Sequence, residues 1–144
     1  MGEPLRILVP VDGSDCALRA VDMAAVLAEA MGGIIDLLYV AYFDSDTDLE
    51  DEVSWLPDIA TKPYRLEGEE ILAKARNRVP SQVPTETHRR TGKPSEAILE
   101  LAKELQVAII AVGGRGLGVV SGFFLGSVSQ AVMEEAECSV LVVK

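Results

Sequence analysis

The stretch Val112-Gly113-Gly114-Arg115-Gly116, separated by nine residues from Gly126-Ser127, decides how this chain is interpreted. An apolar run begins at Val107 and leads into this stretch, and a helical pattern from Ser127 to Ala136 follows it. A strand, a glycine-rich loop and a helix start in this order are typical of a phosphate site. The first N–H groups of a helix lack partners within the helix, and the helix dipole favours negative charge there. Glycines also let the main chain approach a ligand with no side chain between them.

Two better-known phosphate signatures do not fit this stretch. G-x-x-x-x-G-K-[ST] fails because no lysine follows a glycine at the required offset. G-x-G-x-x-G fails because Val119 and Ser121 stand where a third glycine is needed. A simpler alternative stays open, since Ser127 and Gln130 match a capping box and would then only start a helix. In that alternative, Gly113 would only end a strand.

The length and charge of the chain limit its function. It has 144 residues, of which 49% are hydrophobic, so we expect a single domain over residues 1–144 with an ample core. The net charge is −10 and the isoelectric point is about 4.5, a negative field that repels nucleic acid and anionic membrane surfaces. Neither is therefore an expected partner. ATP is also an anion, so a nucleotide site must act locally, through backbone dipoles and a divalent cation.

No signal peptide and no membrane insertion are predicted. The N-terminus lacks a basic region, and no apolar run reaches about eighteen residues. Cys16 and Cys138 lie far apart without a CxxC spacing, which favours reduced thiols and a cytoplasmic location. His88 is the single histidine and stands in a short alternating strand, so we predict neither a metal ligand set nor a catalytic triad.

Strand and helix patterns alternate along the chain. The predicted strands cover residues 5–11, 34–40, 85–90, 107–112 and 139–143, and the predicted helices cover 15–31, 61–78, 95–105 and 127–136. Ser14 is expected to cap the first helix and Thr61 the second. The strand over 85–90 is the most polar, which indicates a sheet edge.

This order predicts an α/β fold with a five-stranded parallel sheet, doubly wound and Rossmann-like. Ligands of such sheets lie beyond the carboxyl ends of the strands, where the strand order reverses. Glycines and other turn-forming residues are concentrated after the first strand, at Asp12 and Gly13, and after the fourth strand, at 113–116. We therefore predict the strand order 3-2-1-4-5, which brings both loops into one crevice.

The segment from Ala41 to Lys62 is acidic and irregular. Its Asp44-x-Asp46-x-Asp48 run imitates the start of a calcium loop. Leu49 replaces the glycine and Trp55 replaces the glutamate that such a loop requires. We interpret the segment as a solvated loop, with a flap or a short helix as alternatives.

Taken together, the motifs resemble the universal stress protein family. They occur in one order and register over nearly the whole chain, and only the segment 41–62 is unmatched. The matching motifs are Val9-Pro10-Val11-Asp12-Gly13-Ser14, Leu38-Tyr39-Val40, Gly92-x-Pro94-x-x-x-Ile98, Gly113-x-x-Gly116-(nine)-Gly126-Ser127 and Cys138-Ser-Val-Leu-Val-Val143. The G-x-x-G-(nine)-G-[ST] spacing is that of the family's ATP-binding branch.

The resemblance implies where a nucleotide would lie. Adenine would lie near Val40, the ribose beside two of the loop glycines, and the triphosphate on backbone N–H groups at the start of the last helix, with two serine hydroxyls adding hydrogen bonds. Asp12 would lie near the nucleotide, oriented towards Mg²⁺ through water; its alternative role is that of a turn residue. Arg115 either reaches a phosphate or is a surface residue. The implied nucleotide-binding residues are Pro10, Val11, Asp12, Val40, Val112, Gly113, Arg115, Gly116, Gly126, Ser127, Val128 and Ser129.

The chain departs from the family's pattern at two positions and shares its C-terminal strand. Ala108 stands where the family often has aspartate, and Ser139 where it usually has proline. In the family, the last strand pairs with its counterpart in another subunit. The resemblance therefore implies a homodimer through Ser139 to Val143.

The function implied is that of an ATP-binding cytoplasmic regulatory protein of the stress-response type. AMP and ADP are further candidate ligands, and the protein partner is unknown. We predict no catalytic residue, because no side chain is placed to activate water and the phosphate loop has no lysine. Two alternatives stay open. One is an enzyme that hydrolyses ATP slowly, phosphorylates itself on Ser127 or Ser129, or adenylates a substrate; the other is an interaction module that binds no nucleotide.

Overall fold

A computed structural model describes the backbone over residues 3–41, 58–115 and 126–144. In the helix that begins at Asp58, side chains are described from Glu67 onwards. The predicted solvated segment from Ala41 to Lys62 therefore lies largely outside the described residues, and Gly116 lies outside them as well.

Strands and helices alternate along the described chain. The strands are β1 (Arg6–Pro10), β2 (Ile34–Ala41), β3 (Thr85–Thr91), β4 (Ile109–Gly113) and β5 (Ser139–Val143). The helices are α1 (Asp15–Met31), α3 (Asp58–Asn77), α4 (Pro94–Leu105) and α5 (Ser127–Glu135). Every predicted element is present in this order.

Two boundaries differ from the sequence prediction by two residues or more, and several others differ by a single residue. The helix α3 begins at Asp58, so the prediction of Thr61 as its cap is wrong. The strand β4 begins at Ile109, because the N–H of Val107 still donates to the carbonyl of Ala102 at the end of α4.

All neighbouring strands are parallel, and their order is β3-β2-β1-β4-β5. This order confirms the predicted fold class. The strand β3 lies at one edge, as its polar sequence predicted, and β5 lies at the other. The strand order reverses between β1 and β4, so the edge beyond these two strands is the expected place for a ligand.

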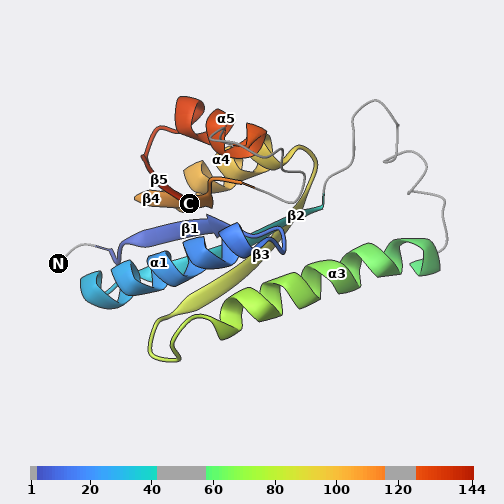
Figure 1. The fold of residues 1–144 in the computed structure, drawn as a ribbon, viewed down its shortest axis with the longest axis horizontal. Coiled ribbons are helices and arrows are strands. Elements are labelled where there is room, and N and C mark those ends of the chain that lie inside the picture. Colours follow the sequence, from blue (N-terminus) through green and yellow to red (C-terminus); the bar gives the residue numbers. More distant parts are fainter. Residues whose placement is uncertain (1–2, 42–57, 116–125) are drawn as a thin grey trace.

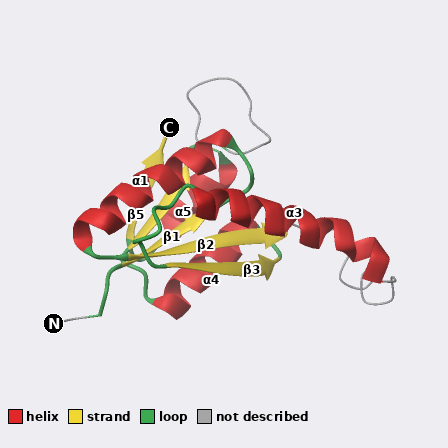
Figure 2. Cartoon of the chain, turned by 90° about the horizontal axis from the view of Figure 1, so that it is seen from below, coloured by secondary structure: helices red, strands yellow, loops and turns green. Residues whose placement is uncertain are grey.

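The helices cover the sheet on both faces. Figure 1 shows α1 and α3 on one face and α4 and α5 on the other, and Figure 2 shows α1 and α3 lying over the strands. The described chain is thus a three-layer, doubly wound α/β protein.

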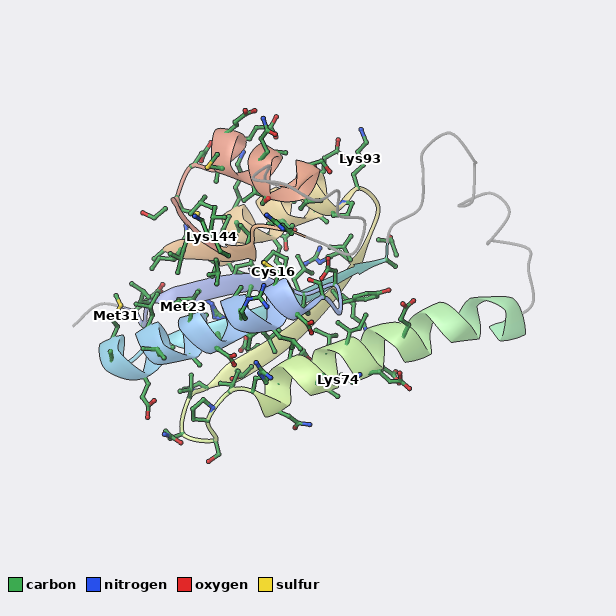
Figure 3. The ribbon with its side chains drawn as sticks, in the orientation of Figure 1. Cys16, Met23, Met31, Lys74, Lys93 and Lys144 are labelled. Carbon is green, nitrogen blue, oxygen red and sulfur yellow. The ribbon has the colours of Figure 1, made fainter. Side chains whose placement is uncertain are left out.

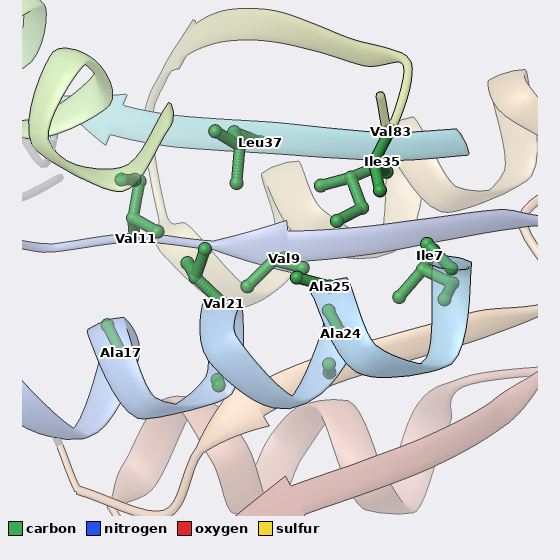
Figure 4. Close-up of a cluster of buried hydrophobic side chains, with 14 of the residues drawn as sticks. Ile7, Val9, Val11, Ala17, Val21, Ala24, Ala25, Ile35, Leu37 and Val83 are labelled. Atoms are coloured by element: carbon green, nitrogen blue, oxygen red, sulfur yellow. The ribbon is translucent and has the colours of Figure 1, made fainter. Parts of the chain in front are cut away.

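A first core lies between the sheet and the α1–α3 layer. Figure 4 shows side chains of β1 and β2, such as Val9 and Leu37, facing Val21 and Ala24 of α1. All four side chains are fully buried. Burial of one valine or leucine side chain contributes about 1.5–3 kcal/mol to the free energy of unfolding. The alanines of α1 let the helix approach the sheet closely.

A second core lies between the sheet and the α4–α5 layer. Leu8 and Leu38 of the sheet pack there with Ile98 and Leu101 of α4 and Val132 of α5. The buried residues of α4 recur at the spacing of one helix face.

Among the described residues of the sheet, one charged side chain is fully buried. Asp36 on β2 is fully buried, and it contacts Arg6 on β1 and His88 on β3. Burial raises the pKa of the Asp36 carboxyl, while the hydrogen bond with His88 and the charge of Arg6 lower it. Polar side chains therefore connect three neighbouring strands on this part of the sheet.

Candidate nucleotide-binding site

The candidate site lies where β1 and β4 end side by side. These strands are neighbours in the sheet, so the loop after Pro10 and the loop after Gly113 start next to each other. The two loops rich in special residues thus share one edge of the sheet, as the predicted strand order required.

The loop after β1 forms hydrogen bonds within itself and to β2. The N–H of Val11, a buried residue, donates to the carbonyl of Leu38 on β2 at 2.8 Å. Asp12 Oδ1 accepts the N–H of Ser14 at 2.9 Å, and Gly13 has a φ of 89°, which favours glycine. Asp12 is therefore a turn residue in this structure, with a second carboxylate oxygen that this turn does not use.

Ser14 closes the start of α1. Its Oγ accepts the N–H of Ala17 at 3.2 Å, and Asp15 adds a negative charge in the first turn. This confirms the predicted cap. One amide in the first turn of α1, that of Ala17, is thus already paired with a side chain.

Gly113 allows β4 to end against α1. A Cβ atom at Gly113 would lie 2.9 Å from the carbonyl carbon of Cys16 and 3.0 Å from the amide nitrogen of Ala17. Both are backbone atoms and cannot rotate away. Glycine is therefore needed here for close packing, whatever ligand role it has.

The two ends of the glycine-rich loop are joined to each other. The N–H of Gly126 donates to the carbonyl of Gly114 at 2.7 Å. The hydroxyl of Ser129 is buried and lies 3.3 Å from the same carbonyl and 3.0 Å from the carbonyl of Gly126, to which it donates. The Gly126 N–H and the Ser129 hydroxyl therefore hold the two described ends of the loop together.

The loop is also fixed to the C-terminal strand. The N–H of Gly114 donates to the carbonyl of Val143 at 2.8 Å, and the thiol of Cys16 donates to the same carbonyl at 3.1 Å. Figure 3 places Cys16 where α1 begins. Sequence reasoning missed this contact, since no local pattern relates residues that lie 127 positions apart.

The start of α5 has no side-chain cap. Its N-cap residue is Gly126, and its first turn holds no acidic residue. The capping-box alternative is wrong, because Ser127 is already the first helical residue and the side-chain amide of Gln130 donates to Glu134 instead, at 3.4 Å. The helix dipole and the amides of Ser127 and Val128 therefore favour an anion at this point.

Apolar side chains lie beside this helix start. Val40 at the end of β2, Val112 near the end of β4 and Val128 in α5 all belong to the core cluster under α4 and α5. The structure thus brings together three of the residues implied for the nucleotide. Arg115 is exposed at the end of the described loop, and Gly116 lies outside the described residues.

The chain is similar to known proteins over nearly its whole length. Residues 5–144 match the model of the universal stress protein family. A universal stress protein of Thermus aquaticus is 37% identical over 138 residues, which cover 96% of this chain and 97% of the relative. No helix in the described ranges is long and apolar enough to cross a membrane.

Solved structures show the same architecture. The hypothetical protein MJ0577 superposes with a TM-score of 0.78 at 25% identity, covering 97% of this chain and 95% of that one. A universal stress protein solved in complex with cAMP has a TM-score of 0.68 at 26% identity, covering 99% and 98% of the two chains. The fold defines a doubly wound α/β protein in which the start of α5 lies at the sheet edge where such folds bind ligands. By the family match over nearly its whole length, the chain belongs to the universal stress protein family.

Proposed function

We propose that this chain is an ATP-binding regulatory protein of the stress-response type. The observation that carries the proposal is a contrast between two helix starts at the same sheet edge. The first turn of α1 is capped by Ser14, whereas the first turn of α5 has neither a side-chain cap nor an acidic residue. Only the second is suited to a phosphate group.

In this proposal the triphosphate lies against the amides of Ser127, Val128 and Ser129. The hydrogen bond between Gly126 and Gly114 fixes this helix start before a ligand arrives, so little ordering is needed on binding. The exposed hydroxyl of Ser127 adds a donor. The ribose lies beside Gly113 and Gly116, and the adenine lies beside Val40 and the apolar cluster that contains it.

A Mg²⁺ ion fits the same proposal. Magnesium is held by one or two carboxylates, substrate phosphates and several waters. Asp12 supplies one such carboxylate, because its turn uses only Oδ1 and leaves Oδ2 for a water-mediated contact. The ion would offset the chain's negative charge where the triphosphate binds.

The relative solved with cAMP supports an adenine nucleotide as the ligand class. In this proposal the bound nucleotide is not consumed. It determines the conformation of the chain or which protein partner, as yet unidentified, the chain binds. The free thiols of Cys16 and Cys138 favour a reducing, cytoplasmic compartment.

The ligand is tested by thermal unfolding of the purified chain with ATP, ADP, AMP and cAMP, each with and without Mg²⁺, and with GTP as the base control. A ligand at 100 times its dissociation constant adds about 2.7 kcal/mol to the unfolding free energy. We expect the largest rise in melting temperature with ATP and Mg²⁺. No response to any adenine nucleotide would overturn the proposal.

We further propose that β5 forms a homodimer seam. It is an edge strand paired only with β4, and its residues Val140 to Val143 are half-buried and apolar in the single chain. Such an edge favours pairing with a second copy. Sedimentation equilibrium should give about twice the chain mass of 15.4 kDa, and a single-chain mass at every concentration would contradict the seam.

A further inference from the structure

A second group of ionisable side chains lies on another part of the sheet. It consists of Arg6 on β1, Asp36 on β2, and Glu86 and His88 on β3. Leu8 and Leu38, two positions after Arg6 and Asp36, face α4 and α5, so by strand alternation the group lies on that face. The proposed nucleotide does not touch any of these four residues.

The four side chains are in direct contact. His88 Nε2 lies 2.9 Å from Asp36 Oδ1, and Arg6 Nε lies 3.3 Å from Asp36 Oδ2. Arg6 Nη2 donates to Glu86 Oε2 at 2.6 Å. One ligand atom each from Asp36, Glu86 and His88 lies within 4.8 Å of the other two. These three potential ligand atoms therefore lie close together on two neighbouring strands.

The charges of the group do not balance when His88 is neutral. Asp36 and Glu86 carry two negative charges, and in the described part of the chain the permanent cation Arg6 contacts both of them. A fully buried carboxylate is costly unless its charge is compensated. A further positive charge, from a proton or from a bound cation, would complete the group.

An imidazole nitrogen with two carboxylates is a donor set for zinc-type ions. Zinc binds such atoms at about 2.0–2.2 Å, and its three-residue sites leave a fourth position for water. The side chains of Arg6 and Glu86 are 21% and 56% exposed, so Arg6 can withdraw into solvent and Glu86 can move inward without disturbing the core. Asp36 and His88 are held more firmly, at 0% and 19% exposed.

We propose that Asp36, Glu86 and His88 bind a divalent transition-metal ion of the zinc type, and that Arg6 holds the two carboxylates when no metal is bound. A divalent ion neutralises both carboxylates and displaces the guanidinium. The neutral imidazole of His88 donates its Nε2 lone pair to the ion in place of its contact with Asp36. Arg6 is then the competitor that sets how tightly the metal binds.

Cobalt provides the direct test, since Co²⁺ replaces Zn²⁺ and absorbs visible light when protein ligands bind it. A tag-free full-length chain, stripped with chelator, is titrated with Co²⁺ and then with Zn²⁺. We expect one Co²⁺ per chain with a visible band and no near-ultraviolet thiolate band, followed by displacement with Zn²⁺. Because His88 is the single histidine, loss of the band in His88→Asn assigns the nitrogen ligand without ambiguity. Mg²⁺ should not compete, because it prefers oxygen ligands.

Three further variants separate a metal site from a simple ion-pair network. Glu86→Gln should weaken Co²⁺ binding at least about tenfold. Its matched control is Glu104→Gln, which removes the same charge from an exposed carboxylate paired with Arg90 and should leave the affinity unchanged. Arg6→Met should strengthen binding about tenfold, because it removes the competitor. Far-ultraviolet circular dichroism confirms that each variant is folded.

Two results would overturn the proposal. One is the absence of Co²⁺ uptake by the wild-type chain, which would leave the group as an ion-pair network. The other is the same Co²⁺ affinity in wild type, His88→Asn and Glu86→Gln, which would place the ion elsewhere on this acidic chain.

Discussion

The N–H group of Gly126 donates a hydrogen bond of 2.7 Å to the carbonyl of Gly114, and this bond closes the base of the loop between the two residues. The N–H of Gly114 in turn donates to Val143 on β5. The start of α5 is therefore fixed to the sheet through these backbone bonds and through the buried hydroxyl of Ser129. No side chain of this connection needs to occupy the space in front of the first helical turn, which is where the phosphate groups are proposed to bind.

Replacing Gly126 with aspartate separates a binding role from a structural one. Gly126 has φ −63° and ψ 157°, which aspartate adopts readily, and aspartate is a favourable N-cap. We expect the unfolding free energy to stay the same or to rise by about 0.5 kcal/mol. The added carboxylate occupies the anion position, so the ATP affinity should fall at least about tenfold, or 1.4 kcal/mol. Calorimetric titration and urea unfolding measure the two effects.

The control for this variant is Ser81→Asp, which adds the same charge in the exposed turn between α3 and β3. It should bind ATP as the wild type does. Equal ATP affinity in Gly126→Asp and wild type would leave α5 as an ordinary helix with no ligand at its start.

Ser129 and Ser127 differ in role although both lie in the first turn of α5. The Ser129 hydroxyl is 3% exposed and donates to backbone carbonyls at the base of the loop, whereas Ser127 is exposed. Ser129→Ala should lower the unfolding free energy by about 1 kcal/mol, because it leaves buried carbonyls with one partner fewer. Ser127→Ala should stay within about 0.5 kcal/mol of wild type. Equal stabilities of the two variants in urea unfolding would show that the loop base does not depend on the buried hydroxyl.

Gly113 is expected to be sensitive to the smallest added side chain. In Gly113→Ala, the new methyl group would meet the backbone of Cys16 at 2.9 Å, so β4 or α1 must shift. Such overpacking typically costs about 1–3 kcal/mol, and the melting temperature should fall by several degrees. Nucleotide affinity should fall as well, because the shift moves the two loops relative to each other. An unchanged melting temperature would mean that the contact between β4 and α1 relaxes freely.

The strand order could be predicted because the signals that define each strand and helix lie in short stretches of the sequence. The apolar run from Ile34 to Val40 predicts a buried strand, the polar run from Thr85 to Arg90 predicts a sheet edge, and Ser14 predicts the start of α1. The order 3-2-1-4-5 followed from placing the two special loops at one crevice. Each of these signals acts within a few residues of chain.

The contacts between distant residues could not be predicted in the same way. The pairing of Asp36 with His88 depends on the register of β2 against β3, and the polar sequence of β3 gave no sign that its histidine faces a buried aspartate. The start of α5 was ambiguous for a different reason. Ser127 is a good cap by composition, but Gly126 occupies the N-cap position and its N–H is bonded to the carbonyl of Gly114. Tertiary contacts here override local preference.

The thiol of Cys138 provides a pH-dependent prediction. Cys138 lies between α5 and β5, and burial raises the pKa of its thiol above the ordinary value, partly offset by backbone hydrogen bonds. The thiolate is the reactive form, so alkylation of Cys138 by iodoacetamide should be slower near neutral pH than that of a cysteine peptide. The alkylation rate should rise with pH, and the pH at which it reaches half its maximum should lie above the corresponding pH of the peptide. Mass spectrometry of peptides from native and urea-unfolded protein measures both cysteines separately. Cys16 is only 6% exposed and donates its S–H to Val143, so it should react more slowly still. Fast labelling of native Cys138 at neutral pH would mean that its pKa is lowered, and that a cation, not burial, controls this thiol.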